Sequence, residues 1–166
     1  MSVAQAGLFR ARWTEQIHDE WTRNLAAKRP DIADKLTHTR NQMNEAVLDC
    51  LITGYEPLIN CLDLPDEDDR HVLAAAIVGR ASVIVNYNLK DFPPEILKPF
   101  GIHAEHPDQF ISYLFDLAPP MVAAQVKTLR TRLKNPPVTV DELLERYLQA
   151  GLPETASDLA TMKDLL

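Results

Sequence analysis

The sequence predicts an α/β domain followed by a helical extension. Apolar residues recur at helical spacing in several segments, and residues 83–85 form a run of consecutive β-branched residues, VIV. Such a run is typical of a parallel strand that is buried on both faces. A Pro-Pro pair at 119–120 marks a boundary, because every segment beyond it has a helical pattern. We therefore predict an α/β domain with a parallel sheet over residues 1–118 and a helical extension over 119–166.

Local signals define the elements of the first half of the chain. Residues 1–9 have weak helical spacing, which indicates a helix fragment. Thr14 is a typical N-cap residue, so we expect a helix from Thr14 to Lys28. Residues 30–47 keep a diluted helical period after an opening proline, which indicates an amphipathic, partly exposed helix. In the irregular segment that follows, the apolar run at 57–59 is a candidate to enter the sheet.

The stretch at 64–92, LPDEDDRHVLAAAIVGRASVIVNYNLKDF, is the centre of the predicted domain. We expect a helix over roughly 67–79, capped by Asp66 or Asp68 and buried through its alanines, and then a strand over 82–87. Further elements are predicted from proline starts and apolar stripes: a helix from 93 to 97, a strand at 101–103, a helix over 107–117, and helices around 122–133, around 140–148 and in the last dozen residues.

Composition restricts the classes of function. The chain has 166 residues and a formal net charge of −7, so its bulk charge does not indicate nucleic-acid binding and suits carboxylates that bind a divalent cation. No apolar run approaches the ~20 residues of a membrane span, and no signal peptide is visible, so the cytoplasm is the expected location. Cys50 and Cys61 are expected to be reduced. No nucleophile elbow or phosphate-binding glycine loop is present.

Carboxylates stand at two places that should meet at one edge of the sheet. Asp69 belongs to the first turn of the alanine-rich helix, while Asp91 follows the strand, with Asn88 nearer to its end. Two carboxylates at one edge repel each other, so either one is protonated or a cation lies between them. Oxygen ligands of this kind suit Mg²⁺ or Mn²⁺. An alternative remains open, in which Lys90 or Arg70 forms a structural ion pair with these acids.

These residues resemble a known family. The stretch LPDEDDRHVLAAAIVGRASVIVNYNLKDFP is similar to the second half of a PIN domain, the metal-dependent ribonuclease fold of VapC-type toxins. The earlier RWTEQIHDEWTRNL resembles the second acidic motif of that family, and NPPVTVDELLERYLQAGLP is similar to the C-terminal region of one bacterial subgroup. The resemblance implies a three-layer α/β/α arrangement. It also implies that the central first strand of the family, with its aspartate, is missing from this sequence.

The resemblance also implies a set of site residues. It places the catalytic and metal-binding acids at Glu20, Asp69 and Asp91, which would hold one or two Mg²⁺ or Mn²⁺ ions. Supporting polar residues are implied at Asp68, Asn88 and Asn86. His71, on an apolar helix, is expected to be structural. Exposed basic residues are candidates for RNA contact, although a solvated charged face is an alternative: Arg10, Arg12, Lys127 and Arg130.

Two functions are therefore weighed. The first is a metal-dependent endoribonuclease of the VapC toxin type, which cleaves RNA phosphodiester bonds with metal-activated water and is silenced by an antitoxin. The second is a catalytically impaired PIN scaffold that binds an antitoxin or dimerises. A phosphatase-like hydrolase ranks far lower, because the sequence has no nucleophilic aspartate motif. The expected partners are RNA, a cognate antitoxin and a second copy of the chain.

Overall fold

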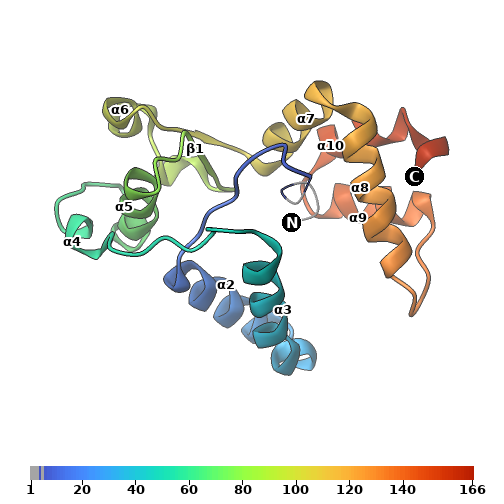
Figure 1. The fold of residues 1–166 in the computed structure, drawn as a ribbon, viewed down its shortest axis with the longest axis horizontal. Coiled ribbons are helices and arrows are strands. Elements are labelled where there is room, and N and C mark those ends of the chain that lie inside the picture. The colour runs from blue at the N-terminus through green and yellow to red at the C-terminus, as the bar shows by residue number, and fades with distance from the viewer. Residues whose placement is uncertain (1–3, 5) are drawn as a thin grey trace. The chain divides into compact units, whose positions relative to one another are not determined.

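The computed structural model describes residue 4 and residues 6–166, and the chain divides into two compact units. Of the described residues, the first unit contains 9–84 and 88–104, and the second contains 4, 6–8, 85–87 and 105–166. Figure 1 shows the elements of each. Residues 1–3 and 5 of the helix predicted at 1–9 lie outside the described residues, and residues 6–9 form turns and bends.

The first unit consists mainly of helices joined by short 3₁₀ turns. Its α-helices are α2 (Glu15–Lys28), α3 (Ala33–Ala46), α4 (Glu56–Ile59), α5 (Arg70–Val78) and α6 (Pro94–Leu97). The 3₁₀ helices are Pro30–Ile32, Glu67–Asp69, Leu89–Asp91 and Lys98–Phe100. Thr14 caps α2 as predicted, since its hydroxyl oxygen accepts a hydrogen bond of 3.1 Å from the backbone N–H of Ile17.

Two short strands form the sheet, β1 (Val83–Val85) and β2 (His103–Glu105). The backbone N–H of His103 donates to the carbonyl of Ser82, and that of Asn86 donates to the carbonyl of Glu105. This slanted pattern is that of a parallel pair of strands. The prediction of an α/β class with a parallel sheet is therefore confirmed for a sheet of two strands. The first unit also has a parallel bridge between Trp13 and Leu51.

Two predictions about the sheet are wrong. Residues 57–59 do not enter the sheet, because they form most of the four-residue helix α4, which has a proline in its first turn. The strand β1 is also not buried on both faces. Ile84 is buried on one face, whereas Val85, which points to the opposite face, is 44% exposed. A β-branched run indicates a strand, but burial depends on which layers cover it.

The second unit is helical from Pro107 onward. It contains α7 (Pro107–Leu117), α8 (Pro119–Arg132), α9 (Val140–Gln149), α10 (Pro153–Ala160) and a final 3₁₀ turn at Lys163–Leu165. The compact unit thus takes in α7, which the predicted boundary at 118 assigns to the α/β domain; that boundary stays a prediction. The buried carboxylate of Asp108 accepts hydrogen bonds of 2.8 Å from the backbone N–H groups of Glu154 and Thr155, which fastens α10 to α7.

Helix α5 lies at the centre of the first unit. Leu73 and Ala76 belong to a core cluster with Ile84 and Phe92, while Ala74 and Ala75 belong to a second cluster with Ile52 and Tyr55. Leu73 and Ala74 are completely buried. Because both sides of α5 are packed, the start of this helix is held rigidly, and the acidic residues precede that start.

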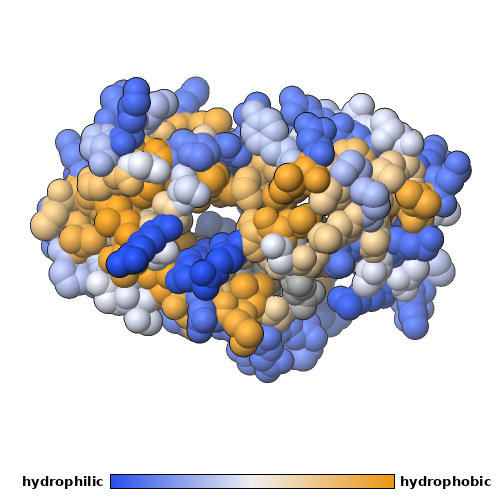
Figure 2. All heavy atoms as spheres, turned by 45° about the horizontal axis from the view of Figure 1, so that its top comes forward, coloured by the Kyte–Doolittle hydropathy of each residue, from blue (hydrophilic) through white to orange (hydrophobic). Residues whose placement is uncertain are grey.

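The surface carries apolar side chains as well as charged ones. Figure 2 shows orange patches of apolar residues among the polar ones. Strongly exposed examples are Leu48, which is 90% exposed, and Leu117, which is 70% exposed. Within the described residues, no helix has the length and apolar character that crossing a membrane requires.

Candidate metal centre

Three aspartates of the first unit converge on one point. Asp66, Asp69 and Asp91 each present a carboxylate oxygen, and these oxygens lie within 4.8 Å of one another. Asp66 is exposed, whereas Asp69 and Asp91 are partly buried. We call these three residues the aspartate cluster.

Local structure explains how each carboxylate is placed. Asp66 caps the 3₁₀ helix that precedes α5, since its Oδ1 accepts a hydrogen bond of 2.9 Å from the backbone N–H of Asp68. Asp69 is the last residue before α5. Asp91 ends the 3₁₀ helix that follows β1, and the side-chain amide of Asn88 donates to its Oδ2. The two acids predicted from the sequence therefore meet, as expected for the edge of an α/β sheet.

Burial and neighbouring acids determine the electrostatics of the aspartate cluster. Burial raises the pKa of Asp69 from 3.8 to about 6, with further contributions from the negative charges of Asp91, Asp66 and Glu20. A hydrogen bond with Asp91 acts in the same direction. Close carboxylates favour a shared proton or a bound cation, because two ionised groups at this distance repel each other.

Neither of the two nearby basic residues neutralises the cluster. Arg70 instead lies 3.3 Å from the carboxylate of Asp63 and 3.1 Å from that of Glu67. Within the described part of the chain, no ion pair joins Arg70 or Lys90 to Asp66, Asp69 or Asp91. The alternative of a structural ion pair at this point is therefore wrong for Arg70, whose guanidinium is occupied on other acids.

Glu20 approaches the aspartate cluster from helix α2 and lies against a histidine. Its Oε1 lies 2.9 Å from Nε2 of His71, the second residue of α5, which is 2% exposed. Burial lowers the pKa of His71, while Glu20 acts to raise it, so the imidazole is neutral near pH 7. The contact is short but poorly aligned for a hydrogen bond, and Nδ1 has no hydrogen-bond partner among the described residues.

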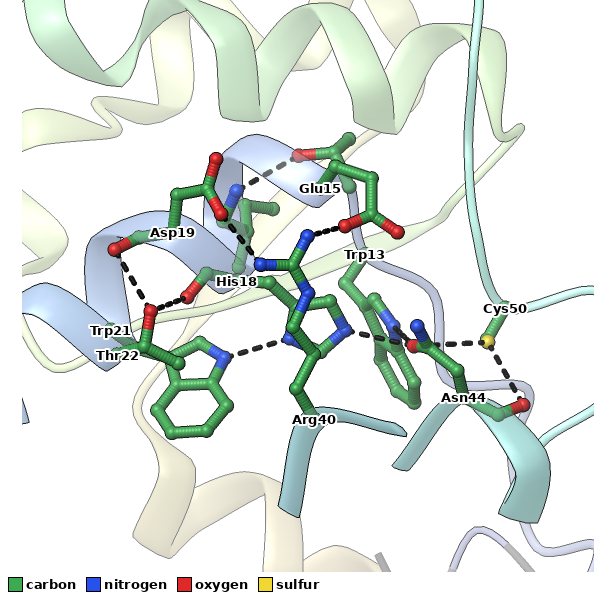
Figure 3. Close-up of polar contacts among 11 residues, drawn as sticks. Trp13, Glu15, His18, Asp19, Trp21, Thr22, Arg40, Asn44 and Cys50 are labelled. Atoms are coloured by element: carbon green, nitrogen blue, oxygen red, sulfur yellow. Dashed lines mark hydrogen bonds and ion pairs between the residues drawn. The ribbon is translucent and has the colours of Figure 1, made fainter. Parts of the chain in front are cut away.

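A buried polar network fixes the helix that carries Glu20. Figure 3 shows His18 of α2 between two indoles and an amide. The indole N–H of Trp21 donates to Nδ1 of His18 over 2.9 Å, and Nε2 lies 2.8 Å from Oδ1 of Asn44 on α3. The indole N–H of Trp13 donates to the same oxygen over 2.8 Å. Because the indole is only a donor and Oδ1 only an acceptor, His18 accepts through Nδ1 and donates through Nε2.

An exposed ion-pair bridge reinforces the same pair of helices. Arg40 of α3 donates to Asp19 of α2 over 2.6 Å and also pairs with Glu15 (Figure 3). The α2–α3 hairpin is therefore joined by buried and by exposed contacts. Glu20 projects from a fixed helix, since Asp19 and His18 precede it directly.

The donor set fits a hard divalent cation. The aspartate cluster offers three carboxylates and no thiol or imidazole, which is the ligand chemistry of Mg²⁺ or Mn²⁺ and differs from that of Zn²⁺. Glu20 lies close enough to raise the pKa of Asp69, so it adds a fourth negative charge at the rim. A divalent cation would relieve the repulsion that raises this pKa.

The structure places the remaining predicted residues at different points. Asp66 was expected only as a cap, and its part in the cluster depends on a residue 25 positions away, which no local pattern signals. Asp68 is exposed and outside the cluster. Asn86 directly follows β1 and belongs to the second unit. Its proposed supporting role, and that of Asp68, stay predictions.

The basic residues predicted to contact RNA also differ in their surroundings. Arg10, Arg12 and Lys127 are exposed. Arg130 is half-buried, and its guanidinium donates to the carbonyl oxygens of Val138 and Leu166. Most of the donors of Arg130 are thus engaged inside the second unit, while RNA contact by any of the four residues stays a prediction.

Known proteins are similar to both parts of the chain. A family model described as the VapC50 C-terminal domain matches residues 107–161. A protein of Mycobacterium tuberculosis (strain ATCC 25618 / H37Rv) named "Putative ribonuclease VapC50" is 42% identical over 92 residues, which cover 55% of this chain and 54% of that protein. The match thus spans about half the length of the curated relative. No solved structure matches the chain.

Proposed function

We propose that this chain, which the two matches support as a VapC-type member of the PIN family, is a metal-dependent endoribonuclease of the toxin type. The observation that carries the proposal is the aspartate cluster, in which three carboxylates present oxygens within 4.8 Å of one another. The name of the similar mycobacterial protein supports RNA as the substrate.

The residues of the cluster would divide the work as follows. Asp66, Asp69 and Asp91 would hold Mg²⁺ or Mn²⁺, and Glu20 would stand beside them as a further ligand or as a proton acceptor. When bound, the ion supplies a Lewis acid that activates water and offsets the negative charge of the scissile phosphate. Asn88 orients the carboxylate of Asp91 through its donated hydrogen bond. No side chain needs to act as a covalent nucleophile.

Architecture and partners follow the same proposal. A three-layer α/β/α arrangement around the parallel sheet, a cognate antitoxin that covers the site, and a homodimer are proposed from the similarity to VapC-type proteins. A second candidate function is a scaffold that binds an antitoxin or a second copy without cutting RNA. It is favoured by β1, where Val85 is 44% exposed in a strand with one neighbour in the sheet.

An RNA cleavage assay tests the proposal. The chain is incubated with single-stranded RNA and Mg²⁺ or Mn²⁺, with EDTA as the metal-free condition. We expect metal-dependent cleavage, and we expect Asp69→Asn to reduce it by more than about 100-fold, because a ligand carboxylate is lost. Asp34→Asn is the matched control, since Asp34 is exposed on α3 and lies outside the cluster.

Calorimetric Mn²⁺ binding separates the two candidate functions. Tight binding that Asp69→Asn abolishes, together with cleavage, supports the nuclease. Tight binding without cleavage supports the non-cutting scaffold. Equal cleavage by Asp69→Asn and the unchanged chain would show that the activity comes from a contaminating nuclease and would overturn the proposal.

A further inference from the structure

The second unit contains a hollow that is lined by cations. The cavity measures about 450 Å³, and its lining includes Arg132, Lys134, Asn135, Pro136, Val138 and Arg146. Three of these residues are basic, and no acidic residue contributes to the lining. We call this surface, defined by Arg132, Lys134 and Arg146, the basic hollow.

The wall of the basic hollow is held in place by internal contacts. Arg130 donates from Nη1 to the carbonyl of Val138 over 3.0 Å, and from Nε and Nη2 to the carbonyl of Leu166 over 3.2 and 3.0 Å. An antiparallel bridge between Lys134 and Pro137 closes the loop before α9. The loop is therefore anchored at both ends, and Arg130 is the structural residue that anchors it.

Two of the acids beside the basic hollow, Glu142 and Asp141, are engaged in other contacts. Glu142 accepts hydrogen bonds from the backbone N–H and the hydroxyl of Thr139, which begin α9 as a capping box. Asp141 pairs with Lys163. Among the described residues, no ion pair involves the three cations of the hollow. Arg146 also lines a neighbouring hollow with Asp141, Glu142 and Glu145, where it makes the weakest contribution to the lowered pKa of Glu142.

The three cations are exposed and no acid lines the hollow, so this surface is locally positive in a chain of net charge −7 and suits an anionic ligand. Two of the three cations are arginines, whose planar guanidinium groups can donate two parallel hydrogen bonds to the oxygens of one phosphate. No aromatic residue lines the hollow, so it offers no platform on which a base could stack. The chemistry is that of a contact to a sugar–phosphate backbone and does not read base identity.

We propose that the basic hollow binds the phosphate backbone of the RNA substrate, outside the aspartate cluster and independently of any metal. This proposal rests on the proposed ribonuclease function for the identity of the anion as RNA. It gives the helical second unit a role of its own, which is to hold the substrate strand through sequence-independent contacts.

Equilibrium binding of RNA at several salt concentrations tests the proposal. A fluorescent single-stranded RNA is titrated with the full chain in EDTA, which prevents metal-dependent cleavage, and its anisotropy is followed between about 50 and 200 mM salt. The test variant removes the three cations of the hollow: Arg132→Gln, Lys134→Gln and Arg146→Gln. The control variant removes three exposed cations of the first unit: Lys28→Gln, Lys35→Gln and Lys98→Gln.

The expected result is specific to the hollow. Each phosphate contact on a single strand contributes about 0.7 to the slope of log K against log salt, so the test variant should lose about 2 from that slope. Its Kd at low salt should rise by about 10-fold or more, while the control variant keeps the slope of the unchanged chain. Both variants should bind Mn²⁺ as the unchanged chain does, and circular dichroism checks that both are folded.

Other outcomes overturn the proposal. An unchanged slope in the test variant, or equal losses in both variants, would show that the hollow does not contact RNA. An acidic peptide that loses affinity for the test variant while RNA does not would identify a protein segment as the ligand. If the chain cleaves RNA but the slope of the test variant is unchanged, the nuclease proposal stands and the role of the hollow is refuted. If the slope falls but the chain does not cleave RNA, the hollow binds RNA and the nuclease proposal is refuted.

Discussion

Replacing Asp69 by asparagine should stabilise the metal-free protein at neutral pH while it destroys the metal site. Asparagine keeps the shape of the side chain but carries no charge into the partly buried position beside Asp91 and Asp66. The amide of the asparagine can also donate a hydrogen bond to the carboxylate of Asp91, whereas the carboxyl group of Asp69 can do so only when it is protonated. Stability and function are therefore expected to change in opposite directions at this residue.

The magnitude follows from the pKa of Asp69, which burial and neighbouring acids raise from 3.8 to about 6. A rise of this size corresponds to about 3 kcal/mol against the ionised form. Because Asp69 keeps part of its surface in water, solvent screening reduces this to about 1 to 2 kcal/mol. A raised folded-state pKa gives stability that is complete below pH 3.8 and is lost as the pH rises through about 6.

Urea unfolding in EDTA measures this effect. At pH 8 the Asp69→Asn variant should exceed the unchanged chain by about 1 to 2 kcal/mol, and near pH 4 the difference should disappear. With Mn²⁺ at about 100 times its Kd, the unchanged chain should gain about 2.7 kcal/mol and the variant almost nothing. A variant that is no more stable at pH 8, or one that Mn²⁺ stabilises equally, would refute the reasoning.

Two further predictions concern other buried groups. His71→Met should weaken Mn²⁺ binding by about 10-fold in calorimetry, because Glu20 loses the imidazole that lies against it and limits its positions, and the same change should have no effect in a Glu20→Ala background. Asp108→Ala should lower the free energy of unfolding by about 2 to 3 kcal/mol in urea titrations, since two backbone N–H groups at the start of α10, those of Glu154 and Thr155, lose their buried acceptor.

Controls and contrary outcomes are available for both. Equal loss of Mn²⁺ affinity from His71→Met in both backgrounds would mean that the histidine does not act through Glu20. Asp116→Ala is the control for Asp108, because Asp116 is exposed on the same helix. Burial acts to raise the pKa of Asp108, but the hydrogen bonds from Thr155 and Glu154 lower it overall. An equally small effect of both alanine variants would contradict the role of Asp108.

Local signals made much of the secondary structure predictable. The N-cap at Thr14, the proline starts at Pro94 and Pro107, and the VIV run at 83–85 each depend on residues within a few positions of one another. The meeting of Asp69 and Asp91 was also predictable, because a helix start and the residues after a strand share one edge of an α/β sheet.

Other features of the site have no local signature. Glu20 and His71 are 51 positions apart, yet their side chains touch, and the sequence predicted His71 as structural. The sequence predicted Asp66 as a helix cap, and the structure confirms this role. Asp66 also lies with Asp91 in the aspartate cluster, which the sequence did not predict. Arg130 belongs to a basic helix in the sequence, but in the structure its guanidinium donates hydrogen bonds to the carbonyl oxygens of Val138 and Leu166.

The sequence by itself determined the acidic character of the site, the helices that carry it and the family that it resembles, since these depend on short-range propensity and on residue identity. Only the tertiary structure decided that three aspartates meet at one point and that Val85 of β1 is exposed. The reason is physical: burial, repulsion and pairing arise between side chains that folding brings together, and their distances in space are not set by their separation along the chain.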